Sequence, residues 1–81
     1  MARLIEGTKM IIKLKEMRAV RDLSQSQLAG KINMSLSNLQ RYEQGKMRSI
    51  PFNTLESFCK ALSCQPGDLI FIENSEDANS D

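Results

Sequence analysis

The stretch LSQSQLAGKINMSLSNLQRYEQGK, residues 23–46, predicts two short helices joined by a tight turn. Ser24 is a good N-cap for the first helix, because its hydroxyl can accept a hydrogen bond from a free N–H group of the first turn. Asn33 tolerates the left-handed backbone with which a chain leaves a helix. Ser35 can cap the second helix, and Gly45 ends it. Helices this short cannot bury both faces, so one face packs on the rest of the chain and the other is free for a partner.

The second helix, expected over residues 36–44, carries two kinds of side chain. Leu39 and Tyr42 lie three residues apart on one face, which is typical of a core stripe. The other face carries hydrogen-bonding groups that suit the base edges and phosphates of DNA. These side chains are Ser37, Asn38, Gln40 and Arg41, and Leu36 begins the helix beside them.

This arrangement resembles the helix-turn-helix of the Cro/C1-type (phage-repressor-like, XRE family) DNA-binding proteins. The matching residues are Leu23-Ser24-Gln25, Leu28-Ala29, Ile32, Ser35, Leu39, Tyr42-Glu43, Gly45-Lys46, Thr54-Leu55-Glu56 and Ala61-Leu62. The resemblance covers roughly residues 12–69. It implies an all-α fold, a compact five-helix lambda-repressor-like DNA-binding domain, here with a short C-terminal β-strand. The chain departs from the family pattern at Asn33, where glycine is frequent, and at Leu36, where a polar base reader is frequent.

The resemblance and the chemistry of the side chains together predict the DNA contacts. We expect base readout by Leu36, Ser37 and Arg41, because arginine offers a bidentate fork to guanine, serine donates or accepts, and leucine can contact a thymine methyl. Phosphate contacts are expected from Gln25, Ser35, Asn38, Lys46 and Arg48. For each of these, an ordinary solvated side chain is the alternative.

A basic residue of the first helix is expected to pair with an acidic residue of the recognition helix. In the resembling family, the residue that matches Arg18 often pairs with the one that matches Glu43. Such a structural ion pair would tie the first and third helices together. A solvated surface arginine is the alternative for Arg18.

Composition limits the function classes. The 81 residues make one small domain with room for one modest core and no deep catalytic cavity. The sequence has no histidine, which removes the usual zinc ligand sets and any Cys–His nucleophile pair. We therefore expect no enzyme, no catalytic residue, no metal site and no cofactor. The two cysteines, Cys59 and Cys64, are expected to be reduced, buried thiols, and a disulfide or redox pair is the alternative.

Charge divides the chain unevenly. Residues 73–81 hold four acidic side chains and no basic one, for a net charge of −4. Residues 1–72 hold 11 basic and 6 acidic side chains, for +5, as a phosphate-binding surface requires. We expect an N-terminal segment at 1–9, the helix-turn-helix domain at 10–72 and an acidic disordered tail at 73–81.

Outside the central stretch, the residues from 10 to 21 favour a first helix, and a clean apolar stripe predicts a helix up to Leu62, with Pro51 at its first position. A short helical turn should open at Pro66, and a β-favouring run follows at residues 70–72. An isolated strand is not stable, so its partner is either the N-terminal segment, around Leu4-Ile5 or residues 10–12, or the same strand of a second subunit.

The function expected is that of a sequence-specific transcriptional regulator, a repressor, that reads the major groove of double-stranded DNA with the helix at about 36–44. The family usually binds DNA as a symmetric homodimer, and the run at 69–72 is one candidate interface. No apolar run approaches the ~18 residues of a membrane helix, so no membrane association is expected, and the expected location is the cytoplasm. The alternative function is an antitoxin or another protein-interaction module with the same fold.

Overall fold

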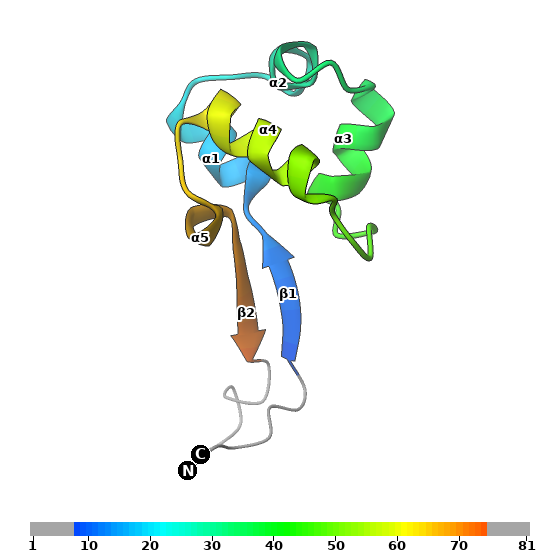
Figure 1. Cartoon of the computed structure of the whole chain (residues 1–81), viewed down its shortest axis with the longest axis vertical. Helices are drawn as coiled ribbons and strands as arrows, with labels where there is room; N and C mark the ends of the chain where they lie inside the picture. Colours follow the sequence, from blue (N-terminus) through cyan, green and yellow to red (C-terminus); the bar gives the residue numbers. More distant parts are fainter. Residues whose placement is uncertain (1–7, 75–81) are drawn as a thin grey trace.

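The computed structural model describes residues 8–74 as five helices and a two-stranded antiparallel ribbon. In chain order the elements are β1 (Thr8–Ile12), α1 (Leu14–Val20), α2 (Gln25–Lys31), α3 (Leu36–Glu43), α4 (Phe52–Leu62), α5 (Pro66–Leu69) and β2 (Ile70–Asn74). The five helices form one body, and the ribbon of β1 and β2 extends away from it (Figure 1). This arrangement confirms the predicted five-helix fold and its short C-terminal strand, and it supplies the partner of that strand.

The core lies between the five helices and is built from leucine and two aromatic rings. The Tyr42 ring of α3 meets the Phe58 ring of α4 edge to face, with ring centroids 5.6 Å apart. The buried core residues are Leu14, Leu28, Ala29, Leu39, Tyr42, Phe58, Leu62 and Leu69. Every helix contributes at least one of them, so α2 and α3 are fixed by packing against the rest of the body.

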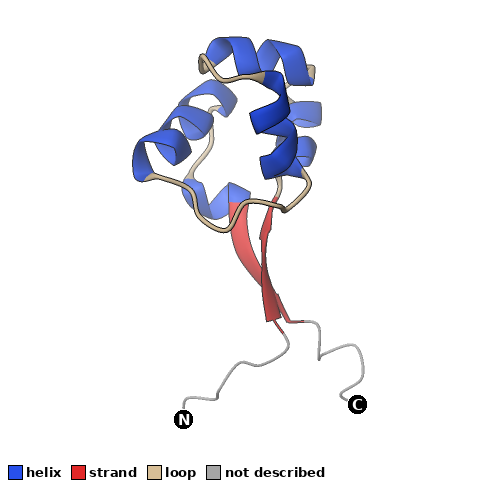
Figure 2. Ribbon diagram, turned by 90° about the vertical axis from the view of Figure 1, so that its right-hand side faces the viewer, coloured by secondary structure: helices blue, strands red, loops and turns tan. Residues whose placement is uncertain are grey.

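The ribbon carries a different pattern on each of its faces. In its register Met10 is opposite Ile72, Ile11 opposite Phe71 and Ile12 opposite Ile70. Ile12 and Ile70 pack on the core. Met10 and Ile72 continue the same face and are 64% and 52% exposed. Figure 2 shows the ribbon extending away from the helical body.

Four consecutive helices end in the same way. The residue after the last turn has a positive φ at Asp22 (60°), Asn33 (59°), Gly45 (75°) and Ser63 (53°). At each of them two backbone N–H groups turn back to the closing helix, as in the Met34 N to Ala29 O bond of 2.9 Å after α2. This is the Schellman motif, in which a left-handed residue satisfies carbonyls that the helix leaves free. Only two of these four positions, Asn33 and Gly45, hold the residue types that adopt the left-handed conformation most readily.

The structure corrects the expected first helix. Residues 10–12 are the end of strand β1, and α1 begins only at Leu14. The β-branched pair Ile11 and Ile12 finds a complementary strand in β2, and tertiary pairing prevails over local helix propensity.

Other boundaries shift less. Pro51 is the N-cap of α4 and not its first helical residue. Leu69 is the last residue of α5, so the strand begins one residue later than the run at 69–72. β1 and β2 include residues 8–9 and 73–74, which the sequence had assigned to a segment and a tail. Leu4, Ile5 and the end of the acidic tail lie outside the described residues. None of the described helices is both long and apolar enough to cross a bilayer.

Candidate nucleic-acid interface

Side-chain caps fix the two helices of the central stretch. The Ser24 hydroxyl accepts from the Gln27 backbone N–H at 3.0 Å, while the Gln27 side chain accepts from the Ser24 N–H at 2.8 Å. The Ser35 hydroxyl accepts from the Asn38 N–H at 3.1 Å and so begins α3. These capping bonds are each worth about 1 kcal/mol and set where each helix starts.

One face of α3 is buried and the opposite face is open to solvent. Leu39 and Tyr42 are buried in the core, whereas Leu36, Ser37 and Arg41 are exposed. Within the described part of the chain, the Arg41 side chain makes no hydrogen bond or ion pair. The three residues expected to read bases therefore share an accessible face on one rigid helix.

The end of α3 brings the backbones of two basic residues together. Gly45 has φ +75°, and the following Lys46 N–H donates to the Arg41 carbonyl at 3.0 Å. The Schellman turn therefore holds Lys46 next to Arg41 in space, although five residues separate them in sequence. Both side chains are exposed. Two exposed basic side chains that start from adjacent backbone positions can both reach the same anion, such as a phosphate.

Arg18 and Glu43 form a bidentate ion pair that links α1 to the end of α3. Arg18 Nε donates to Glu43 Oε2 at 2.6 Å and Nη2 donates to Oε1 at 3.1 Å. The two side chains are 13% and 6% exposed. Burial raises the pKa of Glu43, but hydrogen bonds from Arg18 and Gln25 and the Arg18 charge outweigh it, and the net pKa lies below its ordinary value. The carboxylate therefore stays ionised and fixes the tilt of α3 against α1.

A chain of amides extends this pair to the start of α2. Gln25 Nε2 donates to Glu43 Oε1 at 2.9 Å, and Gln40 Nε2 donates to Gln25 Oε1 at 3.2 Å. From the sequence, Gln25 is expected at a phosphate and Gln40 on the polar face of the second helix, whereas in the structure both amides join the Glu43 network. The spacing of Gln40 and Glu43, three apart on one helix face, is the signal that could have revealed the cluster.

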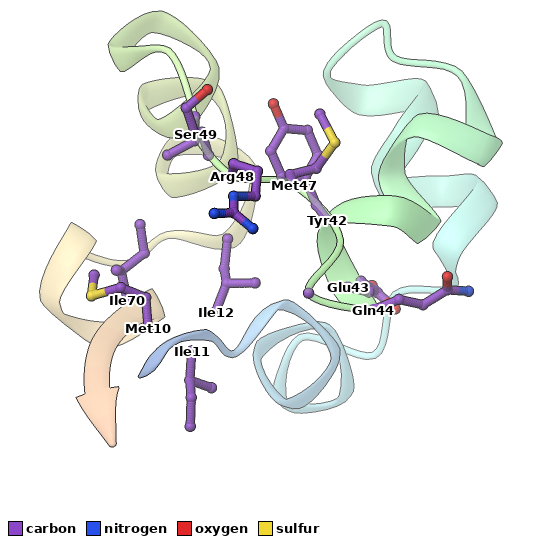
Figure 3. Close-up of a pocket in the computed structure, with 12 residues that line it drawn as sticks. Met10, Ile11, Ile12, Tyr42, Glu43, Gln44, Met47, Arg48, Ser49 and Ile70 are labelled. Atoms are coloured by element: carbon purple, nitrogen blue, oxygen red, sulfur yellow. The ribbon is translucent and has the colours of Figure 1, made fainter. Parts of the chain in front are cut away.

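The remaining predicted phosphate residues are divided between two places. Ser35 and Asn38 line a small polar hollow of about 280 Å³ together with Thr54 and Ser57 of α4. Lys46 stays beside α3, whereas Arg48 lines an apolar groove of about 490 Å³ at the base of the ribbon. Figure 3 shows the Arg48 side chain within this groove, near Met47 and Ile12. The structure thus brings Ser35 and Asn38 together and separates Arg48 from them.

The described residues contain no group of three or more His, Cys, Asp or Glu side chains that could hold a metal ion. The polar side chains that the structure gathers are amides, hydroxyls and cations. These groups recognise ligands by hydrogen bonds and charge.

Comparisons with known proteins agree with this geometry. The family model described as the Cro/C1-type HTH DNA-binding domain matches residues 13–74. An uncharacterized HTH-type transcriptional regulator, YozG, of Bacillus subtilis (strain 168) is 39% identical over 67 residues, which cover 83% of this chain and 80% of that protein. Among solved structures, the transcriptional regulator VanUg (Form II) superposes with a TM-score of 0.66 at 20% identity, covering 91% of this chain and 97% of the other.

Proposed function

Because this chain belongs to the Cro/C1-type helix-turn-helix DNA-binding family, we propose that it is a sequence-specific transcriptional regulator, acting as a repressor. In this proposal α3 enters the major groove of double-stranded DNA, and the protein acts in the cytoplasm by occupying an operator. The YozG relative is named as a transcriptional regulator, in keeping with the proposal.

The open face of α3 is the observation that supports this function most strongly. Leu36, Ser37 and Arg41 are exposed on a helix whose other face is buried and whose tilt is fixed by the Arg18–Glu43 pair. A recognition helix needs this combination, because side chains must reach base edges from a backbone that does not move. Arg41 would pair with guanine, Ser37 with a donor or acceptor, and Leu36 with a thymine methyl.

Phosphate contacts would set the register of the protein on DNA. Lys46 would meet a phosphate beside Arg41 at the end of α3. Ser35 and Asn38 would meet another near the hollow below α4, with Asn38 using its side-chain amide. Gln25 has a second amide hydrogen besides the one bound to Glu43, and this hydrogen would reach a phosphate at the start of α2. Arg48 would need to leave the groove to reach the backbone.

We further propose that the protein binds DNA as a homodimer formed through its ribbon, including the strand predicted at 69–72. A two-stranded ribbon is only marginally stable alone, and both of its outer edges lack a strand partner within the described chain. Met10 and Ile72 add an exposed apolar pair next to the groove lined by Met47 and Ile50. A second copy related by a two-fold axis would cover both features.

Selection of bound fragments from random duplex DNA at near-physiological salt tests this function. We expect an inverted repeat with half-sites about one helical turn apart, and an affinity that falls steeply as salt rises. Weak binding without a motif, or no binding, would contradict the proposal.

The alternative is an antitoxin or another protein-interaction module. The exposed Met10–Ile72 pair is the observation that favours it, because the same surface would suit a different protein. A tight complex with an unrelated protein, together with DNA binding that shows no sequence preference, would support the alternative.

A further inference from the structure

Two cysteines meet at the end of α4. The helix closes with Ser63 at φ 53°, and the Cys64 N–H donates to the Cys59 carbonyl at 3.0 Å. In a Schellman motif these are the two positions whose side chains contact each other across the turn. This backbone bond holds the two residues side by side, and a disulfide needs Cα atoms only ~4.4–6.8 Å apart.

The two thiols share an environment that a small reagent can reach. Both are free and half-buried, and both line an open hollow of about 540 Å³ at the surface. Burial raises the pKa of the Cys64 thiol, and the neighbouring Cys59 raises it further. A thiol whose pKa is raised forms little thiolate at neutral pH, so it is a slow first nucleophile.

We propose that Cys59 and Cys64 form a dithiol site that oxidises reversibly to an intramolecular disulfide, with a low-molecular-weight disulfide such as glutathione disulfide as the oxidant. The Cys59 thiolate attacks one sulfur of the oxidant, which forms a mixed disulfide and releases the first glutathione thiolate. The Cys64 thiolate then attacks the Cys59 sulfur and releases the second. The two cysteine protons end on the two glutathione thiols, so the protein loses two hydrogens and the oxidant gains two.

The bond would join the end of α4 to the connection that leads into α5. α4 ends across the body from α3, and the chain then runs through α5 into β2 (Figure 1). The same turn is already held from α1, because Arg21 Nε donates to the Leu62 carbonyl at 2.7 Å and Nη2 to the Ser63 carbonyl at 3.0 Å. A disulfide there would fix the start of the segment that carries β2 without touching the exposed face of α3.

Equilibration of the full chain in buffers of reduced and oxidised glutathione tests the site. Intact mass after acid quenching should show a monomer lighter by two hydrogens, which dithiothreitol returns to the reduced mass. The Cys59→Ser and Cys64→Ser variants should accumulate a glutathione adduct on the remaining thiol. Accumulation of adducts on the wild-type chain, disulfide-linked dimers, or persistence of both free thiols would overturn the proposal.

A second measurement shows whether the folded turn favours the disulfide, or whether two cysteines five residues apart in sequence would form it equally well in an unfolded chain. The same equilibrium in a concentration of urea that unfolds the chain should require a more oxidising buffer, with an equilibrium constant about tenfold or more lower. An equal constant in the folded and unfolded chains would show that the Schellman turn does not assemble the site. Because both measurements read mass, they are independent of DNA binding.

Discussion

At the scale of single residues, Glu43 connects the helical core to the proposed recognition surface. Its carboxylate accepts from Arg18 of α1 and from Gln25 of α2, while its backbone belongs to the last turn of α3. A charge held this far from water is costly to leave without its partner. The network therefore aligns α1 with the two helices, α2 and α3, that carry most of the proposed DNA contacts.

Replacing this carboxylate should cost stability. We expect Glu43→Gln to lower the free energy of unfolding by about 2–4 kcal/mol at pH 7, because it leaves the Arg18 guanidinium without a counter-ion. Urea unfolding followed by circular dichroism measures this. Glu56→Gln is the matched control, since Glu56 pairs with Lys60 on the open surface at 3.6 Å, and it should cost less than about 1 kcal/mol.

The pH dependence of that difference follows from the direction of the pKa shift. The pKa of Glu43 is lowered on folding from 4.5, so its contribution is complete above that value and is lost as pH falls through the lower pKa of the folded state. The stability gap between wild type and Glu43→Gln should therefore narrow below about pH 4.5. A gap that stays constant down to pH 3 would contradict this account.

Lys46 tests the phosphate assignment at the same scale. We expect Lys46→Ala to weaken binding to all DNA sequences alike and to make the salt dependence shallower by about one unit of slope. Lys60→Ala, near the C-terminal end of α4, is the control and should leave the affinity and the salt slope unchanged. A loss confined to particular sequences would remove Lys46 from phosphate contact.

At the scale of elements, the helix ends decide how α2 and α3 are placed. The turn between them depends on Asn33 at φ 59°, followed by the Met34 N–H that bonds back to Ala29. Asparagine adopts this backbone at low cost, whereas a β-branched residue does not.

The cost of that turn can be measured directly. Asn33→Val should lower the free energy of unfolding by about 1–2 kcal/mol, whereas Asn33→Gly at the same site should change it by only a few tenths. Urea unfolding of both variants checks the expectation. Equal losses would mean that the Asn33 side chain, and not its backbone angle, supports the turn.

Patterns within one element were predictable, and pairings between elements were not. The boundaries of α2 and α3 could be predicted almost to the residue, because their signals are local. These signals are the caps at Ser24 and Ser35 and the core stripe of Leu39 and Tyr42. The first helix was placed too early, since the strand identity of residues 10–12 depends on a partner some sixty residues away.

The candidate site shows the same division. Sequence could name the exposed polar residues of α3, because they alternate with a core stripe at a fixed period. It could not reveal that Gln40 bonds to Gln25, or that Arg48 lines the groove, since both depend on how the loops pack.

At the scale of the whole molecule, the ribbon exposes apolar side chains that no other described part of the chain covers. Met10 and Ile72 face solvent directly opposite each other, in line with Ile12 and Ile70, which pack on the core. An exposed apolar face of this kind, beside the unpaired strand edges of the described ribbon, is typical of a surface that binds a second chain.

A charge on this face should break the proposed dimer. We expect Ile72→Asp to raise the dimer dissociation constant about tenfold or more, because it would bury a carboxylate in an apolar contact. Analytical ultracentrifugation across a concentration series measures the constant. Val20→Asp, at an exposed apolar residue of α1, is the control and should leave the dissociation constant unchanged. A monomeric wild type, or a dimer insensitive to Ile72→Asp, would rule out the ribbon as the interface.

The most direct test of the central proposal, that α3 reads DNA sequence, compares wild type with Arg41→Ala on every single-base variant of the selected site. We predict that the variant binds the best site more weakly by about 1–3 kcal/mol and loses its preference at one base pair in each half-site. An unchanged preference at every position, with or without a uniform loss of affinity, would contradict the assignment of Arg41 to base readout, the most specific base contact proposed for α3.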